Sequence, residues 1–145
     1  MEFAQLGRTG LKVSRLCLGT MNFGPQTTEE DSFAIMDKAL DLDINFFDTA
    51  NVYGWKLGEG VTEGIVGRWF AQGGDRRQRT VLATKLYNSM KGFGRTDNWP
   101  NTTHLSALNI RESCDASLRR VQTGHIDIYQ MHHIERTTPW EEIWQ

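Results

Sequence analysis

The sequence has few cysteines, and their positions do not suggest a metal site or a disulfide framework. Cys17 and Cys114 are the only two among 145 residues; they lie far apart, and neither belongs to a CxxC pair. Zinc sites and disulfide-stabilised folds need more cysteines at shorter spacings. We expect both side chains to be buried free thiols, and we expect no metal site.

The sequence also lacks long apolar runs and clusters of basic residues. No segment approaches the ~20 apolar residues of a membrane-spanning helix, and the opening MEFAQLGRTG has no apolar core typical of an export signal. The formal net charge is −2, and the Lys and Arg residues are spread along the chain. We therefore expect a cytoplasmic protein with neither a membrane nor a nucleic-acid partner.

What the sequence does contain is a regular alternation of short apolar runs and amphipathic segments. The runs are typical of buried strands and cover residues 15–18, 44–47, 80–83 and 126–131. Four helices are predicted after them: one capped by Thr28, one over 61–70, one from about Ser106 that closes at Gly124, and one from Pro139 towards Gln145. Such alternation implies parallel strands with right-handed crossovers, hence an α/β fold. A hairpin is predicted ahead of it, in residues 1–13.

Parallel alternation is compatible with a doubly wound sheet or with a barrel. A dinucleotide-binding glycine loop would favour the doubly wound sheet, but the stretch from Gly19 to Gly24 does not match GxGxxG. The glycines of residues 58–64 have no strand directly before them, so we interpret them as loop residues. A Rossmann domain is therefore not expected.

Polar residues with complementary chemistry follow the predicted strands. Gly19 and Thr20 follow the first strand, Asp48 the second, Lys85 the third and His132 the fourth, with Tyr53 five residues after Asp48. Because the carboxyl ends of parallel strands share one edge, these side chains are expected to converge. One polar residue at a strand end needs no function, since loops face water. An acid, an amine and an imidazole at one edge indicate a site.

Four segments that follow one another in the chain resemble the aldo-keto reductase family. They are GRTGLKVSRLCLGTMNFG, FFDTANVYG, VLATKL and SLRRVQTGHIDIYQMHH. The resemblance implies a parallel (β/α)8 TIM barrel of aldo-keto reductase type, which takes ~250 residues when complete. The chain would cover about the first half, with four βα units and the hairpin of residues 1–13 at the bottom. Residues 1–145 would then be the N-terminal portion of one NADP-dependent oxidoreductase domain.

The resemblance also implies an activity: reduction of an aldehyde or ketone to an alcohol by hydride transfer from NADPH, or alternatively NADH. The family's residues correspond here to catalytic Asp48, Tyr53, Lys85 and His132, and to cofactor-binding Gly19, Thr20, Met21 and Asp48. Hydride delivered to a carbonyl carbon leaves negative charge on oxygen, so Tyr53 would donate a proton as the general acid. Lys85 would make that phenol a stronger acid, and Asp48 would keep the lysine charged. His132 would orient the carbonyl.

Further residues near the predicted site are candidates for the substrate pocket. The aromatic side chains Phe23, Trp55, Tyr87 and Trp99 could form an apolar pocket, although Trp99 is more typical of a lid. The family commonly has a tryptophan where this chain has His133, and we expect the His133 side chain to point away from the site.

Two alternatives to a working enzyme are compatible with the resemblance. The first is a regulatory subunit that senses the cofactor, of the potassium-channel β-subunit type. The second is a non-catalytic half-barrel fragment. The complete set of four residues, with His132 among them, favours an enzyme, because a sensor has no need of a proton donor. The isolated 145-residue chain is expected to be inactive and to aggregate or pair, since half a barrel leaves two sheet edges open.

Overall fold

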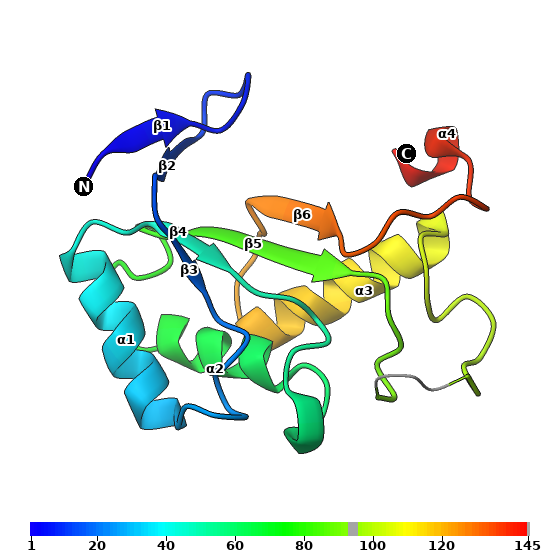
Figure 1. The fold of residues 1–145 in the computed structure, drawn as a ribbon, viewed down its shortest axis with the longest axis horizontal. Helices are drawn as coiled ribbons and strands as arrows, with labels where there is room; N and C mark the ends of the chain where they lie inside the picture. Colours follow the sequence, from blue (N-terminus) through cyan, green and yellow to red (C-terminus); the bar gives the residue numbers. More distant parts are fainter. Residues whose placement is uncertain (93–95, 145) are drawn as a thin grey trace.

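The structure is a computed structural model that describes residues 1–92 and 96–144 (Figure 1). Its elements are β1 (Phe3–Gln5), β2 (Lys12–Ser14), β3 (Cys17–Gly19), α1 (Glu29–Asp41), β4 (Phe46–Asp48), the 3-10 helix η1 (Trp55–Leu57), α2 (Val61–Phe70), β5 (Val81–Leu86), α3 (Ala107–Val121), β6 (Ile128–Met131) and α4 (Trp140–Ile143). The predicted α/β order is confirmed. The last helix was expected to continue to Gln145, but it ends at Ile143 with Trp144 as its cap; Gln145 itself lies outside the described residues.

The main sheet has four parallel strands in the order β3-β4-β5-β6, so each strand pairs with the next one along the chain. The helices α1, α2 and α3 lie on the same side of this sheet (Figure 1). A doubly wound sheet would carry helices on both faces. Consecutive parallel strands with helices on one face are the arrangement of four βα units of a (β/α)8 barrel.

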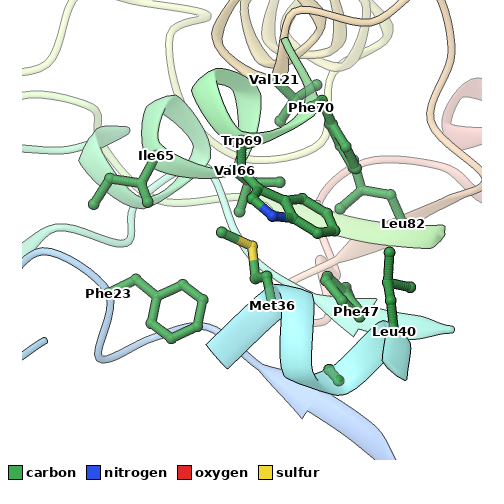
Figure 2. Packing of buried hydrophobic residues seen from close by; sticks show 11 residues of the cluster. Phe23, Met36, Leu40, Phe47, Ile65, Val66, Trp69, Phe70, Leu82 and Val121 are labelled. Atoms are coloured by element: carbon green, nitrogen blue, oxygen red, sulfur yellow. The ribbon is translucent and has the colours of Figure 1, made fainter. Parts of the chain in front are cut away.

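The hydrophobic core lies between the sheet and its helices. Figure 2 shows Met36 of α1 and Trp69 of α2 packed with Phe47 of β4, and the rings of Phe47 and Trp69 are stacked at 5.5 Å between centroids. The indole Nε1 of Trp69 donates a hydrogen bond of 2.8 Å to Asp37, so its one polar atom is satisfied. Each fully buried side chain of this size stabilises the fold by roughly 1.5–3 kcal/mol.

The opposite face of the sheet is not covered by a helix among the described residues. Alternate strand residues face opposite sides, so Leu18 and Phe47 face the helices, whereas Cys17 and Phe46 face the barrel interior. Cys17 is therefore exposed, and Cys114 on α3 is only half-buried. The prediction that both thiols are buried is wrong, because composition does not tell which face of a sheet or helix a residue occupies.

Local capping explains where two of the helices begin and corrects one predicted end. The Thr28 hydroxyl accepts a hydrogen bond from the Asp31 backbone N–H, and Ser106 caps α3 in the same way through Asn109. The prediction that Gly124 closes α3 is wrong. The left-handed residue after α3 is Gln122, with φ of 52°, and its N–H bonds the Leu118 carbonyl.

The N-terminal hairpin is fixed to the amino ends of the main strands. Its strands pair antiparallel, with Ala4 opposite Val13. Asn45, just before β4, accepts a hydrogen bond of 2.7 Å from the Ser14 N–H and donates one of 3.2 Å to the Lys12 carbonyl. The hairpin thus covers the end of the sheet opposite the strand ends that carry the predicted site. No helix in the described part of the chain has the length and apolarity to cross a membrane.

Candidate active site

The carboxyl ends of the four parallel strands bring most of the predicted site residues to one edge. Gly19 and Asp48 end β3 and β4 and stand side by side in the register. Lys85 is the next-to-last residue of β5, and His132 directly follows β6. The backbone N–H of His132 donates to the Leu86 carbonyl at 2.9 Å, which extends the pairing of β5 and β6 by one residue.

Lys85 is the centre of a hydrogen-bonded cluster. Its Nζ lies 2.6 Å from Oδ2 of Asp48, 2.7 Å from the Thr49 carbonyl oxygen and 3.3 Å from the Tyr53 hydroxyl. An ammonium group has three N–H donors, and these three acceptors account for all of them. The Lys85 side chain is 15% exposed and that of Asp48 is 29% exposed, so the pair is partly shielded from water. The geometry therefore joins an acid, an amine and a phenol in one network.

The loop after β4 positions Tyr53 by its backbone. The N–H of Asn51 donates to the Lys85 carbonyl at 3.1 Å, and the Tyr53 carbonyl accepts from Thr62 at 3.2 Å at the start of α2. Gly54 follows with φ of 152°, and a Cβ added there would lie 1.8 Å from the Gly58 carbonyl oxygen. Only glycine permits this turn, so the Tyr-Gly pair fixes where the phenol points.

Trp55 continues this loop in an unusual conformation. Its φ is 52°, in the left-handed region that a bulky residue rarely adopts. Such a conformation costs of order 1–3 kcal/mol and is often found at functional sites. The indole is 66% exposed and borders the cavity described below.

His132 places its imidazole beside Tyr53. The two rings meet edge to face with centroids 5.9 Å apart. Burial, the Lys85 ammonium and His133 lower the pKa of His132, against the opposing effect of Asp48. Its Nδ1 is buried without a hydrogen-bond partner in the described part of the chain. The imidazole is thus held neutral near pH 7, able to donate one hydrogen bond.

At the end of β3 and in the loop after it, one residue supports Asp48 and two others are exposed at the site. Thr20 is fully buried, and both its backbone N–H and its hydroxyl donate to the Asp48 carbonyl at 3.0 Å. Thr20 therefore holds Asp48 in place through the backbone. Gly19 and Met21 are exposed at the same edge, and a Cβ added to Gly19 would meet nothing within 4 Å.

A cavity of about 210 Å³ opens next to the Tyr53 ring. Its lining consists of Met21, Val52, Tyr53, Trp55, Glu59, Asn88, Ser89, His132 and His133. Val52, Glu59, Asn88 and Ser89 were not predicted from the sequence. Asn88 and Ser89 come shortly after the end of β5, so the strand-end rule that identified Lys85 could have included them.

The aromatic residues proposed for the pocket take different positions. Trp55 lines the cavity, whereas Phe23 is only 3% exposed within the core beneath the sheet, so its assignment to the pocket is wrong. Tyr87 packs against His133 from outside the cavity lining, and Trp99 is 76% exposed. Phe23 is buried because the β3–α1 loop turns back onto α2, where the Thr62 hydroxyl donates to the Phe23 carbonyl at 2.9 Å.

His133 also differs from expectation. Its ring is nearly parallel to that of His132, at 16° and 5.3 Å between centroids, and both rings line the cavity. The prediction that His133 points away from the site is wrong. No group of three His, Cys, Asp or Glu side chains in the described ranges is arranged to hold a metal ion.

Comparison with known proteins places the chain among oxidoreductases. The sequence profile of the Aldo/keto reductase family matches residues 15–145. "Uncharacterized oxidoreductase YrpG" of Bacillus subtilis (strain 168) is 58% identical over 146 residues, which cover 100% of this chain and 44% of that protein. "Versiconal hemiacetal acetate reductase" of Aspergillus parasiticus is 34% identical over 160 residues, covering 99% and 45%.

Relatives of a second kind also match. "Probable voltage-gated potassium channel subunit beta" of Oryza sativa subsp. japonica is 35% identical over 143 residues, covering 98% of this chain and 40% of that protein. The chain thus spans less than half the length of these curated relatives.

Proposed function

Because the chain belongs to the aldo/keto reductase family, we propose that the protein reduces an aldehyde or ketone to an alcohol with NADPH, Tyr53 being the general acid. Residues 1–145 would form the N-terminal portion of one (β/α)8 domain, with the hairpin of residues 1–13 at its bottom. The observation that carries the proposal is the position of the Lys85 Nζ, which contacts both the Asp48 carboxylate and the Tyr53 hydroxyl.

The proposed chemistry begins with proton donation by Tyr53. The phenol would give its proton to the carbonyl oxygen as negative charge develops there. The Lys85 ammonium, 3.3 Å from the phenol oxygen, would stabilise the phenolate that remains. Asp48 orients the ammonium toward the phenol, because its carboxylate accepts a hydrogen bond from Nζ at 2.6 Å. The neutral His132 would donate a hydrogen bond to the same carbonyl oxygen and so fix its angle.

The residues present are compatible with a nicotinamide at this edge. Gly19 leaves open space, and Met21 is exposed beside the cavity that Tyr53 and His132 line. Gly19, Met21 and Asp48 would contact the nicotinamide side. Thr20, predicted as a fourth cofactor-binding residue, is fully buried, so we propose that it supports Asp48 through the Asp48 backbone carbonyl instead. When bound, NADPH, or alternatively NADH, supplies the hydride.

Replacement of Tyr53 by phenylalanine tests the proposal in the full-length protein. Tyr53→Phe keeps the ring but removes the proton, so kcat should fall by about 10²- to 10⁴-fold, the usual contribution of a general acid. Cofactor binding, measured by fluorescence titration, should be unchanged. Tyr129→Phe is the matched control, because this hydroxyl is on the helix side of β6 and, within the described residues, donates only a long hydrogen bond of 3.5 Å to the Ile110 carbonyl. Equal turnover in Tyr53→Phe and wild type would refute the assignment.

The similarity to potassium-channel β subunits supports a second candidate, a regulatory subunit that senses the cofactor. Both candidates require cofactor binding, so turnover separates them. A full-length protein that binds NADPH but reduces none of a broad panel of aldehydes and ketones would favour the sensor.

A further inference from the structure

The proposed active-site cavity contains two imidazoles rather than one. His132 and His133 line it together with Tyr53, and their rings are nearly parallel at 5.3 Å. One imidazole is enough to orient a single carbonyl oxygen. A second one at this separation needs an explanation of its own.

The His133 ring is held in place by a series of ring contacts. One side of it faces His132, and Tyr87 meets it at 63° with centroids 5.0 Å apart. Tyr87 in turn stacks on His104 at 4.8 Å, and Nδ1 of His104 lies 3.4 Å from Oε2 of Glu135. The Glu135 carboxylate is buried and accepts three hydrogen bonds from Arg136 and Thr137 through its other oxygen. The ring is therefore pre-organised from the protein side.

The nitrogen atoms of His133 remain available to a ligand. Within residues 1–92 and 96–144, the side chain makes ring contacts but no hydrogen bond. Ser89, by contrast, is already engaged, since its hydroxyl bonds Asn98 and accepts from the Lys91 N–H. A fixed imidazole with unused hydrogen-bonding capacity, facing a cavity, is suited to recognise a polar group of a ligand.

We propose that His133 determines substrate specificity by hydrogen-bonding a second oxygen of the substrate. This inference rests on the proposed function: Tyr53 and His132 hold the reacting carbonyl oxygen. A donor on the adjacent parallel ring then reaches an oxygen carried by the neighbouring carbon. The preferred substrates are therefore α-hydroxy or α-keto carbonyl compounds. The exposed indole of Trp55, on the wall of the same cavity, provides an apolar surface for the rest of the molecule.

A matched pair of substrates tests this in the full-length protein. 2-Hydroxyacetophenone and acetophenone differ by the α-hydroxyl group alone, and kcat/KM is measured for both with wild type and with His133→Phe. Phenylalanine keeps a ring for the contacts with His132 and Tyr87 but has no hydrogen-bonding nitrogen. The preference for the hydroxyketone should fall by roughly 3- to 10-fold, the net value of one neutral hydrogen bond. Intrinsic reactivity cancels, because each substrate is compared with itself across the two proteins.

The control variant is His125→Phe, which removes an exposed imidazole at the opposite end of β6. Its preference ratio should equal that of wild type. The inference is overturned if the ratio of the two kcat/KM values does not change in His133→Phe, whether both values fall by the same factor or neither falls. That result leaves the proposed reductase function intact. If wild type reduces neither these ketones nor any other carbonyl compound, the proposed function itself has failed.

Discussion

At the scale of single residues, the site depends on how its charges are balanced. The Lys85 ammonium is partly shielded from water, and its three donors are all used by Asp48, Thr49 and Tyr53. Removing one partner of a buried ion pair costs about 3–5 kcal/mol, because the other charge is left uncompensated. The exposure of this pair places it below that range. Asp48 thus stabilises the site by accepting one of the three hydrogen bonds that the ammonium donates.

His132 gives the site a measurable pH dependence. Burial, Lys85 and His133 lower its pKa from the ordinary value of 6.5, so the native imidazole takes up its proton at lower pH than the unfolded one. The unfolded state then holds more protons between about pH 6.5 and the native pKa. The stability that this group contributes is complete above about pH 6.5 and is lost as the pH falls through that interval.

Chemical denaturation of the full-length protein on both sides of about pH 6.5 measures this effect. The free energy of unfolding of wild type should fall more steeply on acidification than that of His132→Gln, which has no titrating imidazole. Carboxylates elsewhere contribute equally to both proteins and cancel in the comparison. Identical slopes would show that the His132 imidazole is not perturbed. The NMR titration of its ring protons gives the pKa directly and should place it below 6.5.

The predicted positions of single residues were right where the strand-end rule decided them. They were wrong where a side chain could lie on either of two faces. The rule that parallel strand ends share an edge was enough to bring Asp48, Lys85 and His132 together. It could not place His133, because the second residue after a strand can turn to either side, and here its ring stacks on that of His132. Cys17 and Phe23 were also misplaced, in opposite directions: Cys17 was predicted to be buried and is exposed, whereas Phe23 was predicted to line the pocket and is buried in the core. Residue type does not tell which face of the sheet Cys17 occupies, or that the loop after β3 turns Phe23 back onto α2.

At the scale of elements, the close contact of α2 and α3 depends on one glycine. A Cβ added to Gly67 would lie 2.1 Å from the Arg120 carbonyl oxygen and 2.9 Å from two backbone atoms of Val121. The same helices are joined by a buried ion pair, in which Glu63 accepts from Arg120 at 2.6 Å and from the Thr84 hydroxyl of β5 at 2.6 Å. Because Thr84 precedes Lys85, this network also fixes the end of β5 that carries the ammonium.

Two alanine substitutions in α2 should therefore have opposite effects. Gly67→Ala forces backbone against backbone and should destabilise the protein by about 1–3 kcal/mol, the usual cost of overpacking. Gly64→Ala gains the same helix propensity, but its Cβ meets only the flexible Arg68 side chain, at 3.2 Å. It should be neutral or stabilising by up to about 1 kcal/mol. Thermal unfolding of both variants decides the matter, and an equal change in Tm would contradict the role assigned to Gly67.

The sequence predicted elements better than it predicted their ends. Apolar runs were sufficient to predict the four parallel strands, and local signals predicted the cap at Thr28 and the start of a helix near Ser106. The predicted end of α3 was wrong because glycine is the residue type that usually adopts a left-handed conformation after a helix, and Gly124 is the first glycine after α3. Here Gln122 adopts it two residues earlier, with φ of 52°, and the chain then turns toward β6.

At the scale of the whole molecule, the four-stranded sheet has surfaces that need partners. β3 and β6 each have a neighbouring strand on one side among the described residues. A hollow of about 710 Å³ runs beside β6, bordered by Leu86, Tyr129 and Trp144. On the uncovered face, Phe46 and Ile128 are only half-buried. Open edges beside apolar surface promote association between chains.

Residues 1–145 produced alone should therefore associate and should not reduce carbonyl compounds. Light scattering of the purified chain should give a mass above the 16.6 kDa of a monomer, and NADPH-dependent turnover should be undetectable. The four proposed catalytic residues are all present in this chain, so the loss would arise from the unpaired edges and from cofactor contacts that four strand ends do not supply. If the segment that completes the barrel is added as a separate chain, the two chains should form a 1:1 complex, and reductase activity should return. A fragment that stays monomeric while showing saturable reductase activity would mean that the strand-end cluster needs no further strands to work.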